Sequence, residues 1–370
     1  MRTLLWLAVM CVLYFPAPEE RGQESSAWNR HTIDAASRGA DGVRLADING
    51  DGLLDCVTGW EEGGAIRVCL HPGHNKAQQR WPAVEVGQVR SPEDAVFADV
   101  DDDGNTDVIS CCEGRQRCIF LHLAPGRKLL LKADSWRTVP VRASTGRQWM
   151  YALPARIDAD RRVDFFAGAK GTNACIAWFT ATEDPRDGNA WKMHKIADAG
   201  WIMSMVARDM NDDGLDDLIV SDRRGKTRGV HWFEHPGLSR ANTPWRRHTL
   251  GGTDLECMFL TLADLDRDGR TDVVCNVKGS DILFLRNNGE LSKWEPHRIG
   301  HDLPTGGGKG IAVDDIDGDG MNDLLVTCES ANGKIGAFWL EADRSVFDRH
   351  WIGHDISGKA KGVKYDRPTG

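Results

Sequence analysis

The residues best suited to chemistry are aspartates that alternate with other residues in short, glycine-containing segments. In residues 315–323, aspartates stand at positions 1, 3, 5 and 9 and a glycine at position 6. Acids at alternate residues of a tight turn gather hard oxygen donors, which suits Ca²⁺ with its roughly 6 to 8 oxygen ligands. Glycine at position 6 permits the sharp turn. The expected ligands are one oxygen from each of the first three aspartates, the backbone carbonyl of Met321 and both carboxylate oxygens of Asp323.

Four further intact copies of this segment lie earlier in the chain, and successive copies start 51 to 57 residues apart once a degraded copy is included. A fixed long period indicates a repeat architecture. We therefore expect about five structural calcium ions, held at positions 1, 3, 5 and 9 of the five loops by Asp47, Asn49, Asp51, Asp55, Asp99, Asp101, Asp103, Asp107, Asp209, Asn211, Asp213, Asp217, Asp264, Asp266, Asp268, Asp272, Asp315, Asp317, Asp319 and Asp323.

The degraded copy begins at Arg156 and keeps the acids Asp158, Asp160 and Asp164, but Arg161 replaces the turn glycine. A cation at position 1 stands where the first metal ligand belongs. We expect no calcium here, and Arg156 paired with one of the three aspartates instead.

An EF-hand begins in a similar way but requires an acid at position 12 and flanking helices. Position 12 of the five intact copies is Thr58, Ser110, Val220, Cys275 and Val326. Each loop is followed by an apolar, β-branched run such as residues 323–327, which is typical of a buried strand. An EF-hand is therefore excluded. An aspartate- and glycine-rich turn that binds no ion is the alternative, and five copies in phase argue against it.

The elements around each loop predict four short strands per period, with turn signals between them and no helical pattern. This is the pattern of a β-propeller blade. The fourth strand carries Trp-x-x-His, seen as Trp28/His31, Trp191/His194, Trp245/His248 and Trp294/His297; Trp81 and Trp136 keep only the tryptophan, and His350 only the histidine. Because the pattern recurs in blade after blade, we assign it to packing rather than to a metal or catalytic site.

The two ends of the chain predict an incomplete seventh blade. Residues 361–366 match the inner strand at residues 309–314, and residues 28–33 resemble a fourth strand with no preceding three. Propellers close their ring with strands from both termini. We expect an all-β propeller of six complete four-stranded blades plus an incomplete seventh. A six-bladed ring with an additional tail is the alternative.

Residues 1–23 contain a short apolar run after Arg2 and then a polar break, which predicts a secretory signal. Residues 24–370 would form one propeller domain, secreted, periplasmic or on the cell surface, with no membrane span after signal removal. Nine cysteines would remain. Cys56 with Cys69 and Cys112 with Cys118 could form bridges across hairpins, or each could be a buried hydrophobic residue.

The formal charge of −9 follows from the loops, because five divalent ions add ten positive charges and would bring it to +1. Acidity is thus explained by metal binding. The sequence has no cluster of lysines and arginines and no stacking aromatic motif, so we expect no nucleic-acid partner.

With these loops and strands, residues 28–366 resemble the FG-GAP/VCBS family of calcium-loop β-propellers, which is found in integrin α heads and many secreted bacterial proteins. The Trp-x-x-His strands and Trp-Phe-Glu-His-Pro-Gly at 232–237 are also similar to the propeller of aldos-2-ulose dehydratase-type enzymes, which eliminate water from keto-sugars. The first resemblance implies a calcium-stabilised propeller. The second implies activity on sugars but assigns no catalytic residue.

A ligand face is expected opposite the calcium loops, where the inner strands begin and the repeat is least strict. The inner strands contribute Asp94, Trp149, Tyr151, Trp201, Met203, Glu256, Lys309 and Lys361. The turns between second and third strands add Glu62, Glu113, Arg115, Lys170, Arg223, Arg224, Glu329 and Lys334. Aromatic rings beside carboxylates and ammonium groups suit a sugar. Ordinary solvated loops are the alternative.

Two functions remain open at this point. A binding module for carbohydrate or for an extracellular protein accounts for all of these features. A sugar-active lyase or dehydratase on the same face is the alternative. The chain has no nucleophile elbow, HExxH motif or phosphate-binding loop, so hydrolase and nucleotide-dependent classes receive no support.

Overall fold

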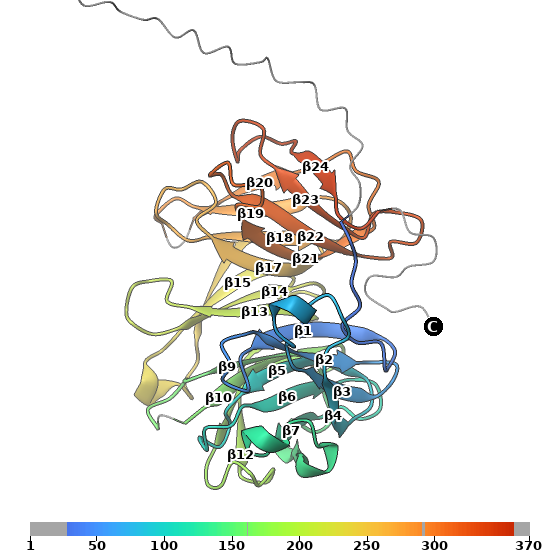
Figure 1. The fold of residues 1–370 in the computed structure, drawn as a ribbon. Coiled ribbons are helices and arrows are strands. Elements are labelled where there is room, and N and C mark those ends of the chain that lie inside the picture. Colours follow the sequence, from blue (N-terminus) through green and yellow to red (C-terminus); the bar gives the residue numbers. More distant parts are fainter. Residues whose placement is uncertain (1–27, 161, 291–292, 359–370) are drawn as a thin grey trace, which may run out of the picture.

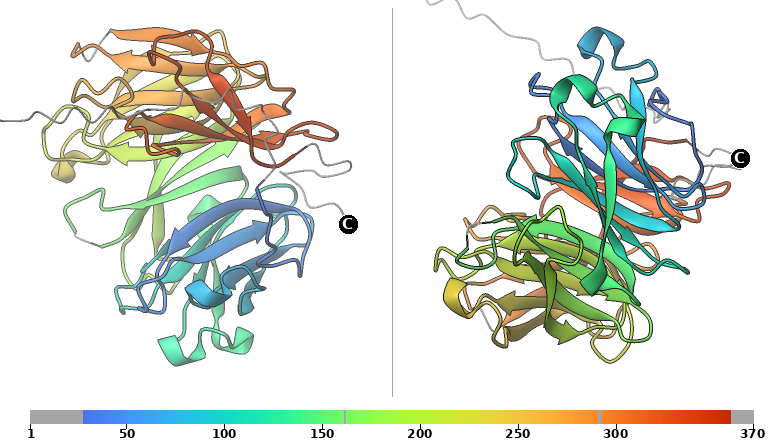
Figure 2. Two further views of the ribbon diagram at one scale, coloured as in Figure 1. Left: turned by 45° about the horizontal axis from the view of Figure 1, so that its top comes forward. Right: turned by 90° about the horizontal axis from the view of Figure 1, so that it is seen from below.

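A computed structural model describes residues 28–160, 162–290 and 293–358, which form six four-stranded antiparallel sheets. The sheets are the blades of a β-propeller and follow one another in chain order around a ring (Figures 1 and 2). Six complete blades are therefore confirmed. Short 3-10 turns lie at His74–Lys76 (η1), Arg127–Leu129 (η2), Ala133–Ser135 (η3), Arg142–Ser144 (η4) and Leu238–Arg240 (η5). No helix in the described ranges is long and apolar enough to cross a membrane.

Each blade is numbered by its order in the chain, and its strands run from the channel outward. Blades 1 to 3 contain β1 (Ala40–Ala46), β2 (Asp55–Trp60), β3 (Ala65–Cys69) and β4 (Ala83–Gln88); β5 (Pro92–Ala98), β6 (Asp107–Cys112), β7 (Ile119–Leu123) and β8 (Arg137–Val141); and β9 (Gln148–Ala155), β10 (Asp164–Lys170), β11 (Cys175–Ala181) and β12 (Trp191–Asp198). Blades 4 to 6 contain β13 (Ile202–Arg208), β14 (Asp217–Asp222), β15 (Gly229–Glu234) and β16 (Arg246–Gly251); β17 (Cys257–Ala263), β18 (Asp272–Val277), β19 (Ile282–Asn287) and β20 (Trp294–Ile299); and β21 (Gly307–Asp314), β22 (Asp323–Glu329), β23 (Ala337–Glu341) and β24 (Ile352–Asp355).

The hydrophobic core lies between blades rather than within one. Five buried clusters fill the five contacts between consecutive blades, from blades 1 and 2 to blades 5 and 6. Large aromatic side chains such as Phe165, Trp178 and Trp232 are at most 2 % exposed there. Burial of each such side chain contributes about 1.5–3 kcal/mol, so stacking of neighbouring blades supplies most of the apolar stabilisation.

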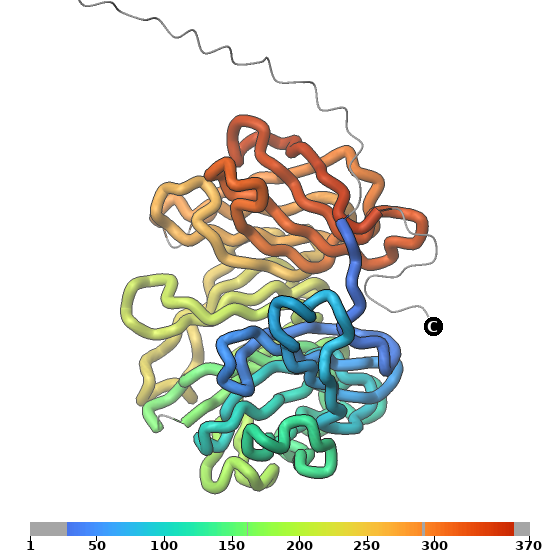
Figure 3. Tube along the Cα trace, in the orientation of Figure 1, coloured from blue at the N-terminus to red at the C-terminus, as the bar shows by residue number. Residues whose placement is uncertain are grey.

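Blades 6 and 1 do not pack in this way. Inner strands of consecutive blades contact one another from β1 through to β21, but no comparable contact joins β21 back to β1 in the described part of the chain. Figures 1 and 3 show the first described residues running between the red blade 6 and the blue blade 1. The backbone N–H of Trp28 donates to Ile356 (2.8 Å), and the N–H of Trp81 donates to Ile33 (2.9 Å).

The fourth strand predicted at residues 28–33 is therefore wrong, since these residues form no strand. A fourth strand needs a third strand as its partner, and the described residues offer none there. The stretch 361–366, which should begin a seventh blade, lies outside the described residues, as does the signal predicted at 1–23.

The Trp-x-x-His residues pack as structural elements except for the predicted pair Trp28 and His31, which are exposed. Tryptophan N–H groups donate to carbonyls of the preceding loop, in the pairs Trp81–Ala77, Trp136–Leu130, Trp191–Pro185, Trp245–Ala241 and Trp351–Asp348. Histidine rings stack on a tryptophan of the third strand, in the pairs His194–Trp178, His248–Trp232 and His354–Trp339. The assignment of His350 to the pattern is wrong, because Trp351 and His354 already form a full Trp-x-x-His in the sequence.

Cysteines contribute to the packing as thiols. All nine in the described residues are buried and free, so neither predicted pair forms a disulfide. Cys56 does stand opposite Cys69 across β2 and β3, as the hairpin prediction requires.

Candidate functional site

The six aspartate-rich loops join the first and second strands of the blades, on one face of the ring. Glycine at position 6 takes a left-handed φ in every intact loop, at Gly52 (+83°), Gly104 (+82°), Gly214 (+83°), Gly269 (+86°) and Gly320 (+90°). Position 4 is left-handed too, even where it is Asp102, Asp212 or Arg267 (φ 56–60°). The sequence did not indicate the left-handed conformation at position 4. Residues other than glycine rarely adopt such φ values, and aspartate or arginine stands at this position in three of the loops.

Carboxylates converge in the loops as a calcium site requires. In blade 2, blade 5 and blade 6, the acids at positions 1, 3 and 9 place oxygens within 4.8 Å of one another. Blades 1 and 4 have asparagine at position 3, which also offers an oxygen. An all-oxygen set of carboxylates, amide oxygen and backbone carbonyl matches the preference of Ca²⁺. The donor set of the five loops therefore fits this ion.

The position-9 aspartates also hold the blade together without any ion. Asp217 is fully buried, with Oδ2 accepting from the N–H of Met210 (3.1 Å) and Oδ1 from the N–H of His235 (2.7 Å). Equivalent pairs of bonds occur at Asp55, Asp107 and Asp272. Each carboxylate thus ties the loop to the end of the third strand. Each carboxylate oxygen of these aspartates has a further lone pair that could bind a cation. That the position-9 aspartates also bind metal therefore stays a prediction.

The degraded loop of blade 3 corrects one expectation. Arg156 is exposed and forms no ion pair with Asp158, Asp160 or Asp164 in the described residues, although these three carboxylates lie within 4.8 Å of one another. In the intact loops the position-1 aspartate accepts backbone N–H groups, as Asp47 does from Gly50 and Gly52. A guanidinium has no acceptor to offer, so the arginine stays in solvent.

Two loops are additionally joined to distant arginines. Arg186, from the loop between β11 and β12, pairs with Asp101 and with Asp103 (3.1 Å). In blade 5, Arg286 pairs with Asp266 (2.5 Å) and Asp268 (3.2 Å). These arginines partly neutralise the loops of blades 2 and 5.

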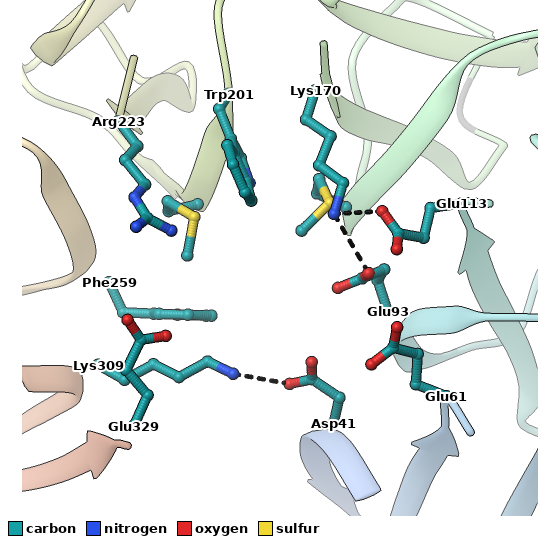
Figure 4. Close-up of a pocket in the computed structure, with 12 residues that line it drawn as sticks. Asp41, Glu61, Glu93, Glu113, Lys170, Trp201, Arg223, Phe259, Lys309 and Glu329 are labelled. Atoms are coloured by element: carbon teal, nitrogen blue, oxygen red, sulfur yellow. Dashed lines mark hydrogen bonds and ion pairs between the residues drawn. The ribbon is translucent and has the colours of Figure 1, made fainter. Parts of the chain in front are cut away.

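At the opposite end of the channel lies a polar pocket of about 220 Å³ (Figure 4). Its lining comes from the starts of inner strands and the turns after second strands: Asp41, Glu61, Glu93, Glu113, Met150, Lys170, Trp201, Met203, Arg223, Phe259, Lys309 and Glu329. Since the aspartate-rich loops follow the other ends of the inner strands, the pocket lies on the face opposite the loops, where a ligand face was expected.

Three of the predicted inner-strand residues line this pocket, namely Trp201, Met203 and Lys309, together with Glu113, Lys170, Arg223 and Glu329 from the turns. The others lie elsewhere. Trp149 is fully buried and donates to Ser144, Asp94 is buried against Arg44, and that arginine covers the ring of Tyr151. Glu256 pairs with Arg223 at 2.8 Å, beside the pocket. Lys361 lies outside the described residues.

Five lining residues, three of them missed by the prediction, share a signal in the sequence. Asp41, Glu93, Met150, Met203 and Lys309 each stand six positions before the start of a loop. In blade 5 the pocket residue is instead Phe259, five positions before Asp264. A strict count of six would have found these residues, whereas a window of five to eight diluted them.

Charged groups around the pocket are mostly paired. Lys170 forms ion pairs with Glu93 (3.3 Å) and Glu113, and Lys309 pairs with Asp41 (3.1 Å) (Figure 4). The Trp201 ring has three cations near it, those of Lys170 (4.8 Å), Arg223 (4.7 Å) and Arg224 (4.9 Å). The pocket therefore combines aromatic faces with both signs of charge.

Glu93 is the most perturbed of the pocket acids. Burial raises its pKa to about 9, against the opposing charge of Lys170 and with a further rise from Glu113. Glu61, Glu93 and Glu113 place carboxylate oxygens within 4.8 Å of one another. One ammonium cannot balance three carboxylates, so Glu93 holds a proton at neutral pH.

The raised pKa of Glu93 predicts a loss of stability as pH rises. The folded state keeps this proton up to a pKa of about 9, whereas the unfolded chain releases it near the ordinary glutamate pKa of 4.5. Between these limits the unfolded state binds one proton fewer, which costs about 1.4 kcal/mol of unfolding free energy per pH unit. We expect Glu93→Gln to flatten this dependence between pH 6 and 8, measured by denaturant unfolding. The matched Glu85→Gln, on the outer strand β4 of blade 1, should leave the slope unchanged. Equal slopes for wild type and Glu93→Gln would contradict the assignment.

A known repeat family matches the aspartate-rich repeats of this chain. A model of the FG-GAP-like repeat matches residues 47–110, 209–275 and 264–326, each match beginning at an aspartate-rich loop. No curated protein matches the chain. Among solved structures, the V. cholerae biofilm matrix protein Bap1 is 16 % identical, with a TM-score of 0.41, over 78 % of this chain and 44 % of that one. The chain thus spans less than half the length of that protein. The three repeat matches and the six blades together support an FG-GAP-type β-propeller.

Proposed function

We propose that the protein is a secreted binding module, in which calcium in the five intact loops stabilises the blades and the pocket at the channel mouth takes a carbohydrate. The observation that carries this proposal is the pocket itself, because residues from all six blades converge on it. The pocket residues stand at nearly the same position before each loop, but their types differ from blade to blade. The rigid propeller can therefore present a specific set of side chains to a ligand.

A sugar suits this pocket in both size and chemistry. At about 220 Å³ the pocket is smaller than the 300 Å³ or more of a typical drug-sized site, so it would take a single sugar unit at a chain end. The rings of Trp201 and Phe259 offer apolar surface for the C–H face of a pyranose. Carboxylates such as Asp41 and ammonium groups such as Lys309 can exchange their mutual bonds for bonds to hydroxyls.

A glycan array with the purified, calcium-loaded protein tests the proposal. We expect binding to a restricted set of glycans and at least a tenfold loss in the double variant Trp201→Ala/Lys309→Ala, with calcium-dependent melting unchanged. Asn242→Ala, near the loop face of blade 4, is the matched control and should bind as wild type. Loss of binding in the control with retention in the double variant would place the ligand on the other face.

An elimination reaction on the same ligand is the second candidate, and Glu93 favours it. A base such as Glu113 would take the proton from a carbon next to a carbonyl or carboxylate. The electron pair of the broken C–H bond would form a C=C bond as the C–O bond breaks, and the leaving oxygen would take the proton of Glu93. Lys170 forms ion pairs with both acids, so its ammonium group could stabilise the negative charge that develops on the substrate. New ultraviolet absorbance on incubation with oligosaccharides, absent in Glu93→Gln, would distinguish this reaction from binding alone.

A further inference from the structure

The turns that follow the second strands carry charges of opposite sign on the two halves of the ring. The residue six positions after each position-9 aspartate stands at the same place in every blade, and in chain order these residues are Glu61, Glu113, Lys170, Arg223, Lys278 and Glu329. Five of them line the pocket at the channel mouth. Blades 3, 4 and 5 therefore present cations there, whereas blades 6, 1 and 2 present carboxylates.

The cationic half gathers three positive charges around a single carboxylate. Oε2 of Glu256 accepts from Nε of Arg223 (2.8 Å) and from Arg224 (3.4 Å), and Nζ of Lys278 lies 3.8 Å from the same oxygen. One carboxylate balances only one of these three cations, so two positive charges remain in excess within the cluster. The guanidinium groups cannot relieve this excess by releasing a proton.

The acidic half relieves most of its own excess. Glu93 and Glu113 share Lys170, and Glu61 places a carboxylate oxygen within 4.8 Å of theirs. The proton on Glu93 removes one negative charge from this group. Two carboxylates and one ammonium group remain, which is one charge short of balance. The larger unbalanced charge therefore lies on the cationic half, and it favours an anionic group on the ligand.

Arg223 has hydrogen-bond donors available at the pocket. Its side chain is only 8 % exposed, its Nε donates to Glu256, and neither terminal nitrogen has a hydrogen-bond partner among the described residues. Figure 4 shows its guanidinium group at the pocket, across from Glu61 and Glu113. The two terminal nitrogens of a guanidinium match the two oxygens of a carboxylate in a bidentate pair. The geometry of Arg223 thus suits a carboxylate on the ligand.

Trp201 lies between the two halves and helps to fix Arg223. The centre of its ring is 4.7 Å from the Arg223 guanidinium and 4.8 Å from the Lys170 ammonium, and its carbonyl accepts the backbone N–H of Arg223 (2.8 Å). The buried carboxylate of Asp222 accepts the backbone N–H of Trp201 (2.7 Å). The indole N–H of Trp201 is itself buried and has no hydrogen-bond partner in the part of the chain that the structure describes. A buried donor without a partner costs free energy unless a bound molecule satisfies it.

We propose that the sugar bound at this pocket is acidic, and that its carboxylate pairs with the terminal nitrogens of Arg223. The inference rests on the proposed function and narrows its ligand to a hexuronate at a chain end. Arg224 and Lys278 add electrostatic attraction to the carboxylate, and the ring of Trp201 contacts the C–H face of the sugar. The hydroxyls on the far side of the sugar donate to the carboxylates of Glu61 and Glu113, so both halves of the pocket contribute to recognition.

Calorimetric titration of the calcium-loaded full chain with methyl hexuronosides and the matched uncharged methyl hexosides tests the inference. We expect the preferred hexuronoside to bind at least tenfold more tightly than its hexoside. Arg223→Gln should weaken hexuronoside binding at least tenfold and leave hexoside binding within about twofold. Arg228→Gln is the matched control, because Arg228 is exposed, ends the same turn and lies outside the pocket lining. This variant should keep the full difference between the two sugars.

A second variant keeps the test decisive if Arg223→Gln does not fold. The side chains of Arg224 and Lys278 are each 47 % exposed, so Arg224→Gln/Lys278→Gln should fold. It should weaken hexuronoside binding at least threefold at low salt, and less at high salt, where exposed charges are screened. Hexosides or 2-amino-hexosides that bind as tightly as the hexuronosides would overturn the acidic ligand and leave the proposed function intact. Failure of all these sugars to bind would overturn both.

Discussion

Excess chelator is expected to lower the melting temperature of this protein by at least about 10 °C. Each intact loop gathers three or four carboxylates, and without a cation their repulsion opposes the turn between the first and second strands. An ion that binds only the folded state stabilises it by about 2.7 kcal/mol at a hundredfold excess over Kd. Five such sites give about 13.5 kcal/mol, which is large beside the total stability of a typical domain.

Variants in a single loop show how much each loop contributes to calcium binding. Asp319→Asn removes one charge from the loop of blade 6 and should lower the number of bound calcium ions by about one, measured by metal analysis after dialysis. Asp160→Asn in the degraded loop of blade 3 is the matched control and should change neither the ion count nor melting in calcium. Melting that is insensitive to chelator, together with near-zero calcium per chain, would contradict metal binding by these loops.

Asp217→Ala is expected to destabilise the protein by about 3–5 kcal/mol, with or without calcium. Its buried carboxylate accepts the N–H groups of Met210 and His235, and an alanine leaves both donors buried without a partner. Each buried, unsatisfied group costs about 1–3 kcal/mol. The loss should appear in denaturant unfolding as a lower midpoint at an unchanged slope.

Asp213→Ala separates this structural role from metal binding. Asp213 stands at position 5 of the same loop, is exposed, and accepts only local hydrogen bonds, from the N–H of Leu215 (2.9 Å) and the side-chain amide of Asn211 (3.2 Å). Its replacement should lower stability in calcium but have little effect in chelator. If Asp217→Ala lost stability only in the presence of calcium, the carboxylate would be a metal ligand and not a tie between the loop and the third strand.

Much of the fold could be predicted from the sequence because its signals are local. A loop with acids at positions 1, 3, 5 and 9 and a left-handed glycine requires only nine consecutive residues, and each of these loops does join two strands. The number of blades followed from the regular spacing of these loops along the sequence. The closing strand at residues 28–33 was wrong for the converse reason, since a strand requires a partner that local sequence does not supply.

The pocket at the channel mouth was predicted in location but only partly in its lining. Which end of the channel carries it follows from strand direction, and Trp201 and Lys309 were found in this way. Glu93 was missed, and Trp149 was wrongly included, because a one-residue error moves a side chain to the other face of a strand. A β-bulge such as that in β17 makes the same one-residue change.

By itself the sequence determined the aspartate-rich loops, the four strands per repeat and the packing of most of the repeated tryptophans, because each of these depends on neighbours within one period. Only the tertiary structure decided which charges meet. Lys170 reaches Glu93 across 77 residues, and Lys309 reaches Asp41 across 268. Such pairs form because closing the ring brings equivalent positions of different blades to one channel mouth. Their partners depend on the geometry of the ring and not on the spacing of residues along the chain.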